Sequence, residues 1–292
     1  MMKNQLDKPS PDVPYSPPQN DLPSLSETVE AHGLGAKKNL GQHFLLDMNI
    51  TRKIARLSAA KEGEHIIEVG PGPGGLTRAL LETGANLTVI ERDERCLEIL
   101  HQLQQAWPGK LSILSDDALK IDYTKFNQSE KPTKFVSNLP YNISTELLVR
   151  WLTMPQNSWV QMTLMFQREV ADRILANHGS KTYGRLSVLS QSAAQPVRGY
   201  DLPARAFTPP PKIDSSVVLF TPKNFAHLKN LEAISKAAFS MRRKMVRTTL
   251  KPVFGDKLDE IVKEAGLLPT ARAEEIDIEK FEKLAALAAT LS

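Results

Sequence analysis

Runs of mostly apolar residues alternate along the chain with segments whose apolar residues recur at helical spacing. Five of the runs are short enough for buried strands, and they cover His65–Val69, Leu87–Ile90, Leu111–Ser115, Lys134–Ser137 and Val160–Phe166. Before the first run, Ile50, Ile54 and Leu57 have the spacing of one helix face. Strands that alternate with helices in this way predict a mainly parallel sheet.

Two later runs, Val197–Tyr200 and Ser216–Phe220, look like paired strands. The segment that connects them contains three consecutive prolines, Pro209 to Pro211, which make it stiff and extended. After Pro222 the pattern is that of helices only. The sequence therefore predicts an α/β, Rossmann-like domain whose mostly parallel, seven-stranded sheet includes an antiparallel hairpin, followed by a small all-helical domain.

These patterns divide the chain into three predicted parts. Residues 1–35 hold six prolines among polar residues, which is typical of a disordered lead. This lead lacks the apolar core of a secretory signal, and its scattered acidic residues are unlike an organellar transit peptide. We expect the catalytic domain at 36–222 and the helical domain at 223–292.

The composition excludes several classes of protein. Hydrophobic residues make up 41% of the 292 residues, and no run approaches the roughly 18 apolar residues of a membrane span. Cys96 is the only cysteine, so the chain has no internal disulfide and no cysteine cluster for zinc. We expect a cytoplasmic protein without a metal, and nothing requires more than a monomer. The formal charge of +4 and the pI near 9.0 favour a polyanionic partner.

A glycine-rich turn follows the first strand. Gly70, Gly72 and Gly75 fit the pattern G-x-G-x-x-G. Glu91 ends the next strand about 20 residues further on, where an acid can accept hydrogen bonds from a ribose diol. The combination is typical of a nucleotide-binding crossover. It leaves a nicotinamide-dependent oxidoreductase open as one alternative.

Two features of this turn argue against a pyrophosphate ligand. Glu68, which we expect to be negatively charged, repels phosphate, and Pro71 and Pro73 have no backbone N–H to donate. S-adenosylmethionine fits better because it carries a ribose, an adenine and a positive sulfonium but no phosphate. At the end of the third strand, Asp117 is placed to accept from the adenine amino group, whereas Asp116 is better explained as a solvated turn residue.

Asn138-Leu139-Pro140-Tyr141 follows the fourth strand, at the edge where open parallel sheets bind ligands. The Asn138 oxygen and the backbone carbonyl of Leu139 or Pro140 can accept hydrogen bonds from an exocyclic amine and turn its lone pair out of the ring plane. Tyr141 offers one stacking face for the base, and Phe207 is a candidate for the other. The alternatives are an ordinary strand-to-loop turn and a phenylalanine that anchors its loop.

The helical segment carries a basic run. Within residues 241–251 five residues are basic and none is acidic; the basic residues are Arg242, Arg243, Lys244, Arg247 and Lys251. Such a run is usually a solvated helix face. Beside a domain that modifies a base, it is more naturally a surface for the RNA backbone, with an affinity that depends on salt.

Five ordered motifs resemble those of the ribosomal RNA adenine dimethyltransferases, and the resemblance extends from residue 36 to the end of the chain. The motifs are Asn39–Leu45, Glu68–Gly72, Asn138–Ser144, Phe207–Lys212 and Phe239–Lys244. The resemblance implies transfer of methyl groups from S-adenosylmethionine to N6 of adenine. By position, the family's cofactor contacts fall on His43, Leu45, Gly70, Glu91, Asp117 and Asn138. Some members have Asn at the position of His43, so a backbone or general polar contact is expected there.

Within the family, the motifs are most similar to the bacterial branch that dimethylates two adjacent adenosines near the 3′ end of 16S rRNA in the small ribosomal subunit. This branch also implies a checkpoint role in ribosome assembly. Phe239–Lys244 and the Pro-Pro-Pro-Lys loop favour it over the macrolide-resistance enzymes that act on 23S rRNA. A non-catalytic RNA-binding assembly factor stays open, as does a DNA adenine methyltransferase, although we see no target-recognition insert for the latter.

Overall fold

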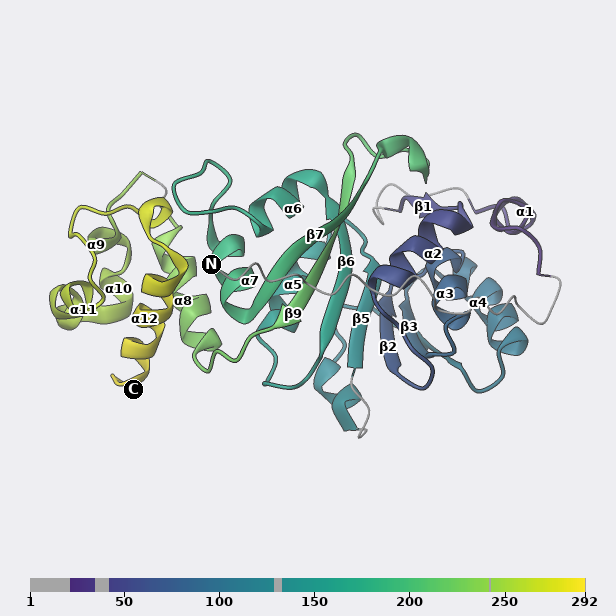
Figure 1. The fold of residues 1–292 in the computed structure, drawn as a ribbon, viewed down its shortest axis with the longest axis horizontal. Helices are drawn as coiled ribbons and strands as arrows, with labels where there is room; N and C mark the ends of the chain where they lie inside the picture. The colour runs from purple at the N-terminus through teal and green to yellow at the C-terminus, as the bar shows by residue number, and fades with distance from the viewer. Residues whose placement is uncertain (1–21, 35–41, 129–132, 242, 292) are drawn as a thin grey trace, which may run out of the picture. The chain divides into compact units, whose positions relative to one another are not determined.

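The computed structural model describes residues 22–34, 42–128, 133–241 and 243–291 (Figure 1). The chain folds into two compact units. Unit 1 comprises the described residues up to 144, together with 158–167 and 199–219. Unit 2 comprises the described residues of 145–157, 168–198 and 220–292.

One seven-stranded sheet has the strand order β4-β3-β2-β5-β6-β9-β7. Its strands are β2 His65–Val69, β3 Asn86–Glu91, β4 Leu111–Ser115, β5 Thr133–Asn138, β6 Gln161–Gln167, β7 Ala194–Leu202 and β9 Ser215–Pro222. The first five are parallel, and in β2 His65 pairs with Asn86 on one side and Thr133 on the other. Strands β7 and β9 form the antiparallel hairpin. The predicted fold class and each of the seven predicted strands are therefore confirmed.

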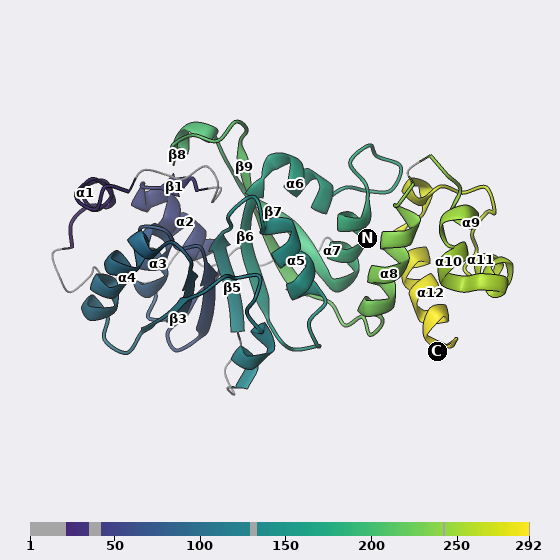
Figure 2. The ribbon, with the colours of Figure 1, turned by 180° about the vertical axis from the view of Figure 1, so that it is seen from behind.

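A second, two-stranded sheet was not predicted. It pairs β1 Phe44–Leu45 with β8 Phe207–Thr208 in antiparallel orientation, so that Leu45 lies opposite Phe207 (Figure 2). A pair of two-residue strands has no periodicity of its own, because only the contact between distant segments defines it.

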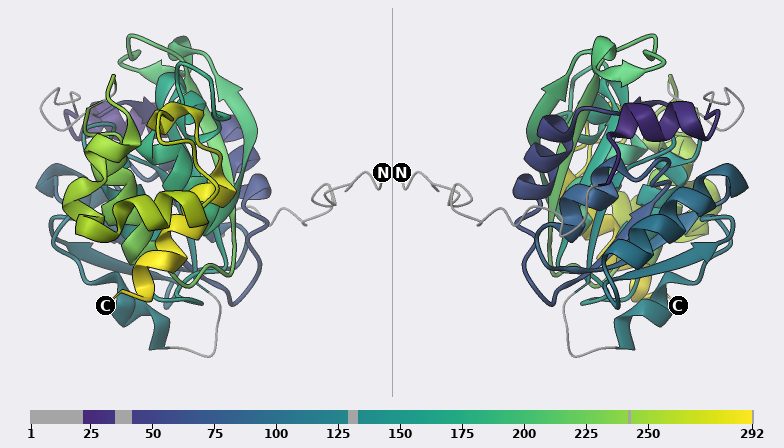
Figure 3. Two further views of the ribbon diagram at one scale, coloured as in Figure 1. Left: turned by 90° about the vertical axis from the view of Figure 1, so that its left-hand side faces the viewer. Right: turned by 90° about the vertical axis from the view of Figure 1, so that its right-hand side faces the viewer.

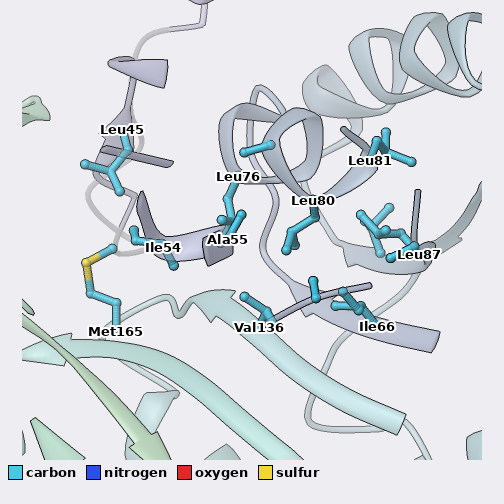
Figure 4. Packing of buried hydrophobic residues seen from close by; sticks show 14 of the residues in the cluster. Leu45, Ile54, Ala55, Ile66, Leu76, Leu80, Leu81, Leu87, Val136 and Met165 are labelled. Atoms are coloured by element: carbon cyan, nitrogen blue, oxygen red, sulfur yellow. The ribbon is translucent and has the colours of Figure 1, made fainter. Parts of the chain in front are cut away.

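The helices of unit 1 cover the apolar side chains of the parallel strands. They are α1 Leu25–Ala31, α2 Met48–Leu57, α3 Gly75–Leu81 and α4 Glu94–Ala106, with 3₁₀ turns at Tyr123–Gln128 and Ala204–Ala206. Figure 4 shows Leu80 of α3 pointing toward Ile66 of β2 and Val136 of β5, and all three side chains are buried. Ile54 of α2 belongs to the same cluster, as its helical spacing predicted.

Part of the predicted disordered lead is ordered. Helix α1 begins at a capping box, in which Ser24 and Glu27 each accept a backbone hydrogen bond from the other. Leu25 and Thr28 of this helix are buried. The prediction of a disordered lead is therefore wrong for residues 22–34, because a short helix can be held by tertiary contacts despite the prolines before it. Residues 1–21 lie outside the described residues.

Unit 2 is mainly helical. Its helices are α5 Ser144–Leu152, α6 Arg168–Ile174, α7 Arg185–Ala193, α8 Leu228–Ala238, α9 Val246–Thr249, α10 Lys251–Phe254, α11 Leu258–Glu264 and α12 Ile278–Ala289, with 3₁₀ turns at Gly255–Lys257 and Ala273–Glu275. The helices expected after Pro222 are present. Val188 and Leu189 of α7 share one buried cluster with Phe281 of α12, so unit 2 contains more than the segment 223–292.

The part of the chain that the structure describes contains neither a membrane-spanning helix nor a cluster of metal-binding side chains. None of its helices has both the length and the apolar character needed to cross a bilayer. In the same residues, no three His, Cys, Asp or Glu side chains gather where they could hold a metal ion.

Phe281 supports the core of unit 2, since its side chain is 0% exposed. We expect Phe281→Ala to lower the free energy of unfolding by about 3–5 kcal/mol, because the truncation loses buried area and leaves a cavity. Leu268→Ala is the matched control: Leu268 is 72% exposed, and its truncation is expected to change stability by less than about 0.5 kcal/mol. Thermal unfolding followed by circular dichroism measures both. Similar shifts for the two variants would contradict the assigned core.

Candidate functional site

A pocket opens at the edge of the sheet where the parallel strands end. Its volume is about 1050 Å³, including space open to solvent. It is lined by residues 42–45, 68–73, 75–76, 90–92, 116–119 and 138–143. This edge is where open α/β sheets bind ligands. All six residues that the resemblance assigned to the cofactor line this one pocket, namely His43, Leu45, Gly70, Glu91, Asp117 and Asn138.

The glycine turn after β2 is shaped by close backbone contacts. Gly70 has φ +69°, and a Cβ atom there would lie 2.9 Å from Cγ of Pro140. Gly72 has φ +55°, and its Cβ would lie 3.0 Å from the ring of Phe44. Only glycine combines a left-handed conformation with such close packing. The turn after β2 therefore lies directly against the motif after β5.

The backbone N–H groups of residues 70–74 are already engaged. Gly70 donates to the Ile90 carbonyl at 2.9 Å and Gly74 to the Pro71 carbonyl at 3.0 Å. Gly72 donates to Oε2 of Glu91 at 3.1 Å, and the two prolines of the turn have no N–H. A turn that cradles pyrophosphate needs free donors, so the geometry favours a ligand without phosphate, as the sequence predicted.

Glu91 ends β3 inside the pocket wall. Its Oε1 accepts hydrogen bonds from the backbone N–H of Arg92 and of Asp93, both at 2.8 Å. Burial raises the pKa of Glu91, and the hydrogen bonds from the three backbone N–H groups oppose the shift. These bonds fix the carboxyl group at the position expected for an acceptor of ribose hydroxyls.

Glu68, which was expected from the sequence to be negatively charged, is buried beside the pocket and has a raised pKa. Its side chain is 1% exposed, and its Oε2 accepts a hydrogen bond from the Thr77 hydroxyl at 2.8 Å. Burial, assisted by the nearby negative charge of Glu91, raises the pKa of Glu68 to about 8. The carboxyl is therefore mostly protonated at pH 7, and the expected repulsion of phosphate by its negative charge is wrong. Residues 70–74 instead disfavour a phosphate ligand, because their backbone N–H groups are engaged or, at the two prolines, absent.

Asp116 and Asp117 both reach the pocket, although the sequence placed only Asp117 there. Asp117 uses Oδ1 to accept from the Leu119 N–H at 3.0 Å, and its Oδ2 lies 3.7 Å from the Arg92 guanidinium. Asp116 is exposed and accepts from the backbone N–H of Asp117. The prediction for Asp117 agrees with its position, and Asp116 is a turn residue at the same rim.

Asn138 presents its amide oxygen to the pocket. Its Nδ2 donates to the backbone carbonyl of His43 at 3.2 Å. A carbonyl can only accept, so this contact determines which end of the amide is the NH₂ group. No hydrogen bond within the described residues engages the Asn138 oxygen, which remains available to accept from a bound amine.

The sequence left open whether the backbone carbonyl of Leu139 or that of Pro140 is the second acceptor for an amine, and the structure distinguishes the two. The Pro140 carbonyl already accepts from the Ile143 N–H at 3.1 Å and closes a tight turn. The Leu139 carbonyl has no such partner among the described residues. Leu139 is therefore the better second acceptor for an amine, and Pro140 shapes the turn by packing against Gly70.

Tyr141 is held at both ends of its side chain. Its hydroxyl lies 2.6 Å from Oγ of Ser215, and its ring stacks on His43 with a centroid separation of 5.5 Å and an angle of 27°. Burial raises the pKa of Tyr141 to about 12, so the phenol stays protonated at neutral pH. His43 is held in turn through Nδ1, which donates to the Pro209 carbonyl at 2.8 Å. His43 therefore covers one face of the Tyr141 ring.

Phe207 does not lie where its proposed stacking role requires. It is 2% exposed, pairs with Leu45 across the short sheet and belongs to the apolar core of unit 1. It is not among the residues that line the pocket. The structure thus favours the anchoring alternative, in which Phe207 holds the segment of Leu45 and His43 over the pocket. A sequence cannot distinguish a buried aromatic anchor from a stacking partner.

Sequence reasoning missed one group that shapes the pocket. Asp93 caps helix α4 and accepts from Gln42 Nε2 at 2.9 Å, which fastens the segment before His43. The hydrogen bond from the Arg95 side chain lowers the pKa of Asp93 to about 2, so the carboxylate keeps its charge. The one available signal was an Asp two residues before Arg95 at a helix start.

The basic run of unit 2 is exposed but is not one helix. Arg243 and Lys244 precede α9, Arg247 lies in it, and Lys251 begins α10. Arg247 and Lys251 pair with exposed aspartates at 2.8 and 3.4 Å. Such surface pairs are worth about 0–1 kcal/mol, so they do not prevent phosphate binding. Arg242 lies outside the described residues.

The fold and the pocket define a Rossmann-like domain with a ligand site at the carboxyl ends of its parallel strands. Among solved structures, the chain is similar to a dimethyladenosine transferase from Plasmodium falciparum, with a TM-score of 0.68, 23% identity and coverage of 83% of this chain and 96% of that one. It is also similar to the 23S rRNA methyltransferase ErmE, with a TM-score of 0.62, 22% identity and coverage of 83% and 98%. At these identities the likeness shows the shared fold.

The chain belongs to the ribosomal RNA adenine dimethylase family, whose model matches residues 33–290. It is 51% identical over 271 residues to Ribosomal RNA small subunit methyltransferase A of Jannaschia sp. (strain CCS1), and the match covers 90% of this chain and 93% of that protein. The protein of the same name from Agrobacterium fabrum is 45% identical over 271 residues, covering 90% and 97%. The family expected from the motifs is confirmed.

The contact between Gly70 and Pro140 allows a direct test of the turn. We expect Gly70→Ala to destabilise unit 1 by about 1–2 kcal/mol for the left-handed backbone and by about 1–3 kcal/mol more for the contact with Pro140. Gly109→Ala is the matched control, because Gly109 has φ +74° with nothing within 4 Å of its Cβ position. Thermal unfolding compares them, and equal losses would show that the contact is unimportant.

The pKa of Glu68 predicts a pH dependence of stability. Above its ordinary value of 4.5 the unfolded chain releases the proton, whereas the folded chain keeps it up to about pH 8. Stability from this group therefore falls as pH rises between these values, by up to about 1.4 kcal/mol per pH unit. Glu68→Gln removes the effect, so its melting temperature relative to wild type should rise from pH 5 to pH 8. The exposed Glu98→Gln is the control, and parallel profiles for Glu68→Gln and wild type would contradict the raised pKa.

Proposed function

We propose that this chain transfers methyl groups to N6 of adenine in small-subunit ribosomal RNA and produces N6,N6-dimethyladenosine. The proposed target is the pair of adjacent adenosines near the 3′ end of 16S rRNA. Membership of the family supports the reaction, and the relatives named for the small subunit support the substrate. We further propose that it works in the cytoplasm as a monomer.

The amide oxygen of Asn138 is the observation that carries this proposal. It is a neutral acceptor with a fixed orientation, because the His43 carbonyl engages the other end of the amide. A neutral acceptor orients an amino group without removing its proton. Together with the Leu139 carbonyl, it can hold both N–H groups of an adenine amine and direct the nitrogen lone pair out of the ring plane.

Tyr141 positions the base that carries this amine. Its hydroxyl contact with Ser215 fixes the ring, and a base extruded from the RNA can stack on it. Stacking on an aromatic side chain is worth about 1–3 kcal/mol per base, which offsets much of the cost of unstacking. No side chain has to act as nucleophile, since alignment of the amine is the main task of the site.

The pocket residues suit S-adenosylmethionine as the cofactor. Glu91 is placed for ribose hydroxyls, Asp117 for the adenine amino group, and the N–H groups of Gly70, Gly72 and Gly74 are already engaged. When bound, the cofactor supplies a methyl group on a positively charged sulfur. Glu68 lines the same pocket without a basic partner among its hydrogen bonds, and a nearby positive charge favours its ionised form.

The basic residues of unit 2 are proposed to bind the RNA backbone. Arg243 and Lys244 are exposed, as are Arg247 and Lys251 with their weak surface pairs. Replacing such pairs by phosphate contacts releases counterions from the RNA, so the affinity should fall with salt. This surface gives affinity, whereas the pocket of unit 1 selects the base.

Methyl transfer from labelled S-adenosylmethionine to small ribosomal subunits from an unmethylated strain tests the proposal. We expect dimethyladenosine only with small subunits, and none with large subunits or duplex DNA. Asn138→Ala should lower the rate by about 100- to 1000-fold, the usual effect of removing one oriented hydrogen-bonding group from a reacting centre. Asn49→Ala, at an exposed position of α2, is the control and should keep the wild-type rate.

Each contrary outcome points to a different function. Label in large-subunit RNA would assign the chain to the macrolide-resistance type. Transfer to duplex DNA would make it a DNA methyltransferase. RNA binding without transfer to any substrate would leave a non-catalytic assembly factor and would refute the role of Asn138.

A further inference from the structure

Helix α1 lies before residue 33, the first residue that the family model matches. It belongs to unit 1, where it lies on the outside of the other helices (Figure 3, purple). We propose that residues 22–34 are a positioning element for the cofactor pocket. This segment holds the first turn of α3, and thereby keeps the glycine turn in the conformation that binds the ligand. The inference rests on the proposed function, because it concerns the same pocket.

A buried arginine ties α3 to this segment. Arg78 lies one turn after Gly75 and is 7% exposed. Its Nη1 donates to the Pro23 carbonyl at 2.6 Å and its Nη2 to the Thr28 hydroxyl at 3.3 Å. Its Nε has no hydrogen-bond partner in the described residues. Both acceptors of this guanidinium therefore belong to residues 22–34, and removal of the segment would leave the cation with no hydrogen-bond acceptor among the described residues.

A leucine of α1 supports the glycine turn itself. Cδ1 of Leu25 lies 3.1 Å from the place of a Cβ atom on Gly75, and the Leu45 carbonyl lies 2.6 Å from the same place. Leu25 is 2% exposed. Gly75 lines the pocket, so Leu25 packs directly behind this part of its wall.

The end of the segment reaches the neighbouring helix. Leu34 is buried against Cys96 and Ile99 of α4. Further along α4, Leu103 fills the space beside Gly74, where a Cβ atom would lie 2.5 Å from its Cδ1. Residues 22–34 thus contact both helices that enclose the glycine turn, one at each end of the segment.

Loss of these contacts should appear in ligand affinity before it appears in the chemical step. If the turn binds ligand in only one of its conformations, the apparent dissociation constant rises by the inverse of that fraction. The acceptor atoms of the motif after β5 are held by other contacts, namely those of Asn138 with His43 and of Tyr141 with Ser215. The rate at saturating cofactor should therefore be preserved.

Two variants of the full chain test the inference by equilibrium binding of S-adenosylmethionine and by steady-state kinetics. Leu25→Ala removes the methyl groups behind Gly75 and should raise the dissociation constant about five- to tenfold. Thr28→Val keeps the shape but removes one acceptor of Arg78, and it should raise the constant about two- to fivefold. For both, kcat with saturating cofactor and RNA should stay within about twofold of wild type.

Two controls separate positioning from general stability. Leu25→Met keeps the apolar contact and should restore most of the affinity, while Glu30→Gln changes only the exposed face of α1 and should have no effect. A lower melting temperature with unchanged affinity would overturn the inference and reduce α1 to a stabilising element. A fall in kcat at unchanged affinity would also overturn it. Failure of the wild-type chain to bind the cofactor would instead refute the proposed function, and this inference with it.

Discussion

The pocket depends on the close approach of two backbone turns that lie far apart in the sequence. Strands β2 and β5 are neighbours and parallel, so the turns after them meet at one edge of the sheet. The approach is possible because Gly70 has no side chain where Pro140 packs. It brings the Asn138 amide beside the segment of His43, and their hydrogen bond leaves the amide oxygen to face the pocket. The orientation of the reacting amine therefore follows from the packing of the sheet.

Around this contact the pocket contains acidic side chains, and the backbone N–H groups of Gly70, Gly72 and Gly74 already donate hydrogen bonds to protein acceptors within unit 1. Glu91 accepts hydrogen bonds from three backbone N–H groups, one of them that of Gly72. Glu68 is mostly protonated at neutral pH because burial raises its pKa to about 8. Such a site offers acceptors and little positive charge. It suits hydroxyl and amino groups or a cation, and it does not suit phosphate.

The short sheet β1·β8 connects the apolar core of unit 1 to the part of the pocket where His43 and Tyr141 stack. Phe207 is buried opposite Leu45, and this pairing holds the segment in which His43 stacks on Tyr141. The sequence made Phe207 a candidate for the second stacking face of the base because an aromatic ring beside the site can serve that purpose. Its side chain instead contributes apolar burial. An aromatic residue next to a site serves either purpose equally well in a sequence pattern, and only its neighbours in space distinguish the two.

The sequence by itself predicted the seven strands and the helices after Pro222, because local periodicity is a property of short segments. Its motifs, through their resemblance to the family, also indicated six residues that are among those lining the pocket. Tertiary structure decided the rest. The protonation of Glu68 and the burial of Phe207 each depend on groups distant in sequence. Residues 22–34 likewise contact a residue distant in sequence, since the Pro23 carbonyl and the Thr28 hydroxyl both accept from Arg78. A residue's charge, free acceptors and exposure are set by what surrounds it, and that is known only once the chain has folded.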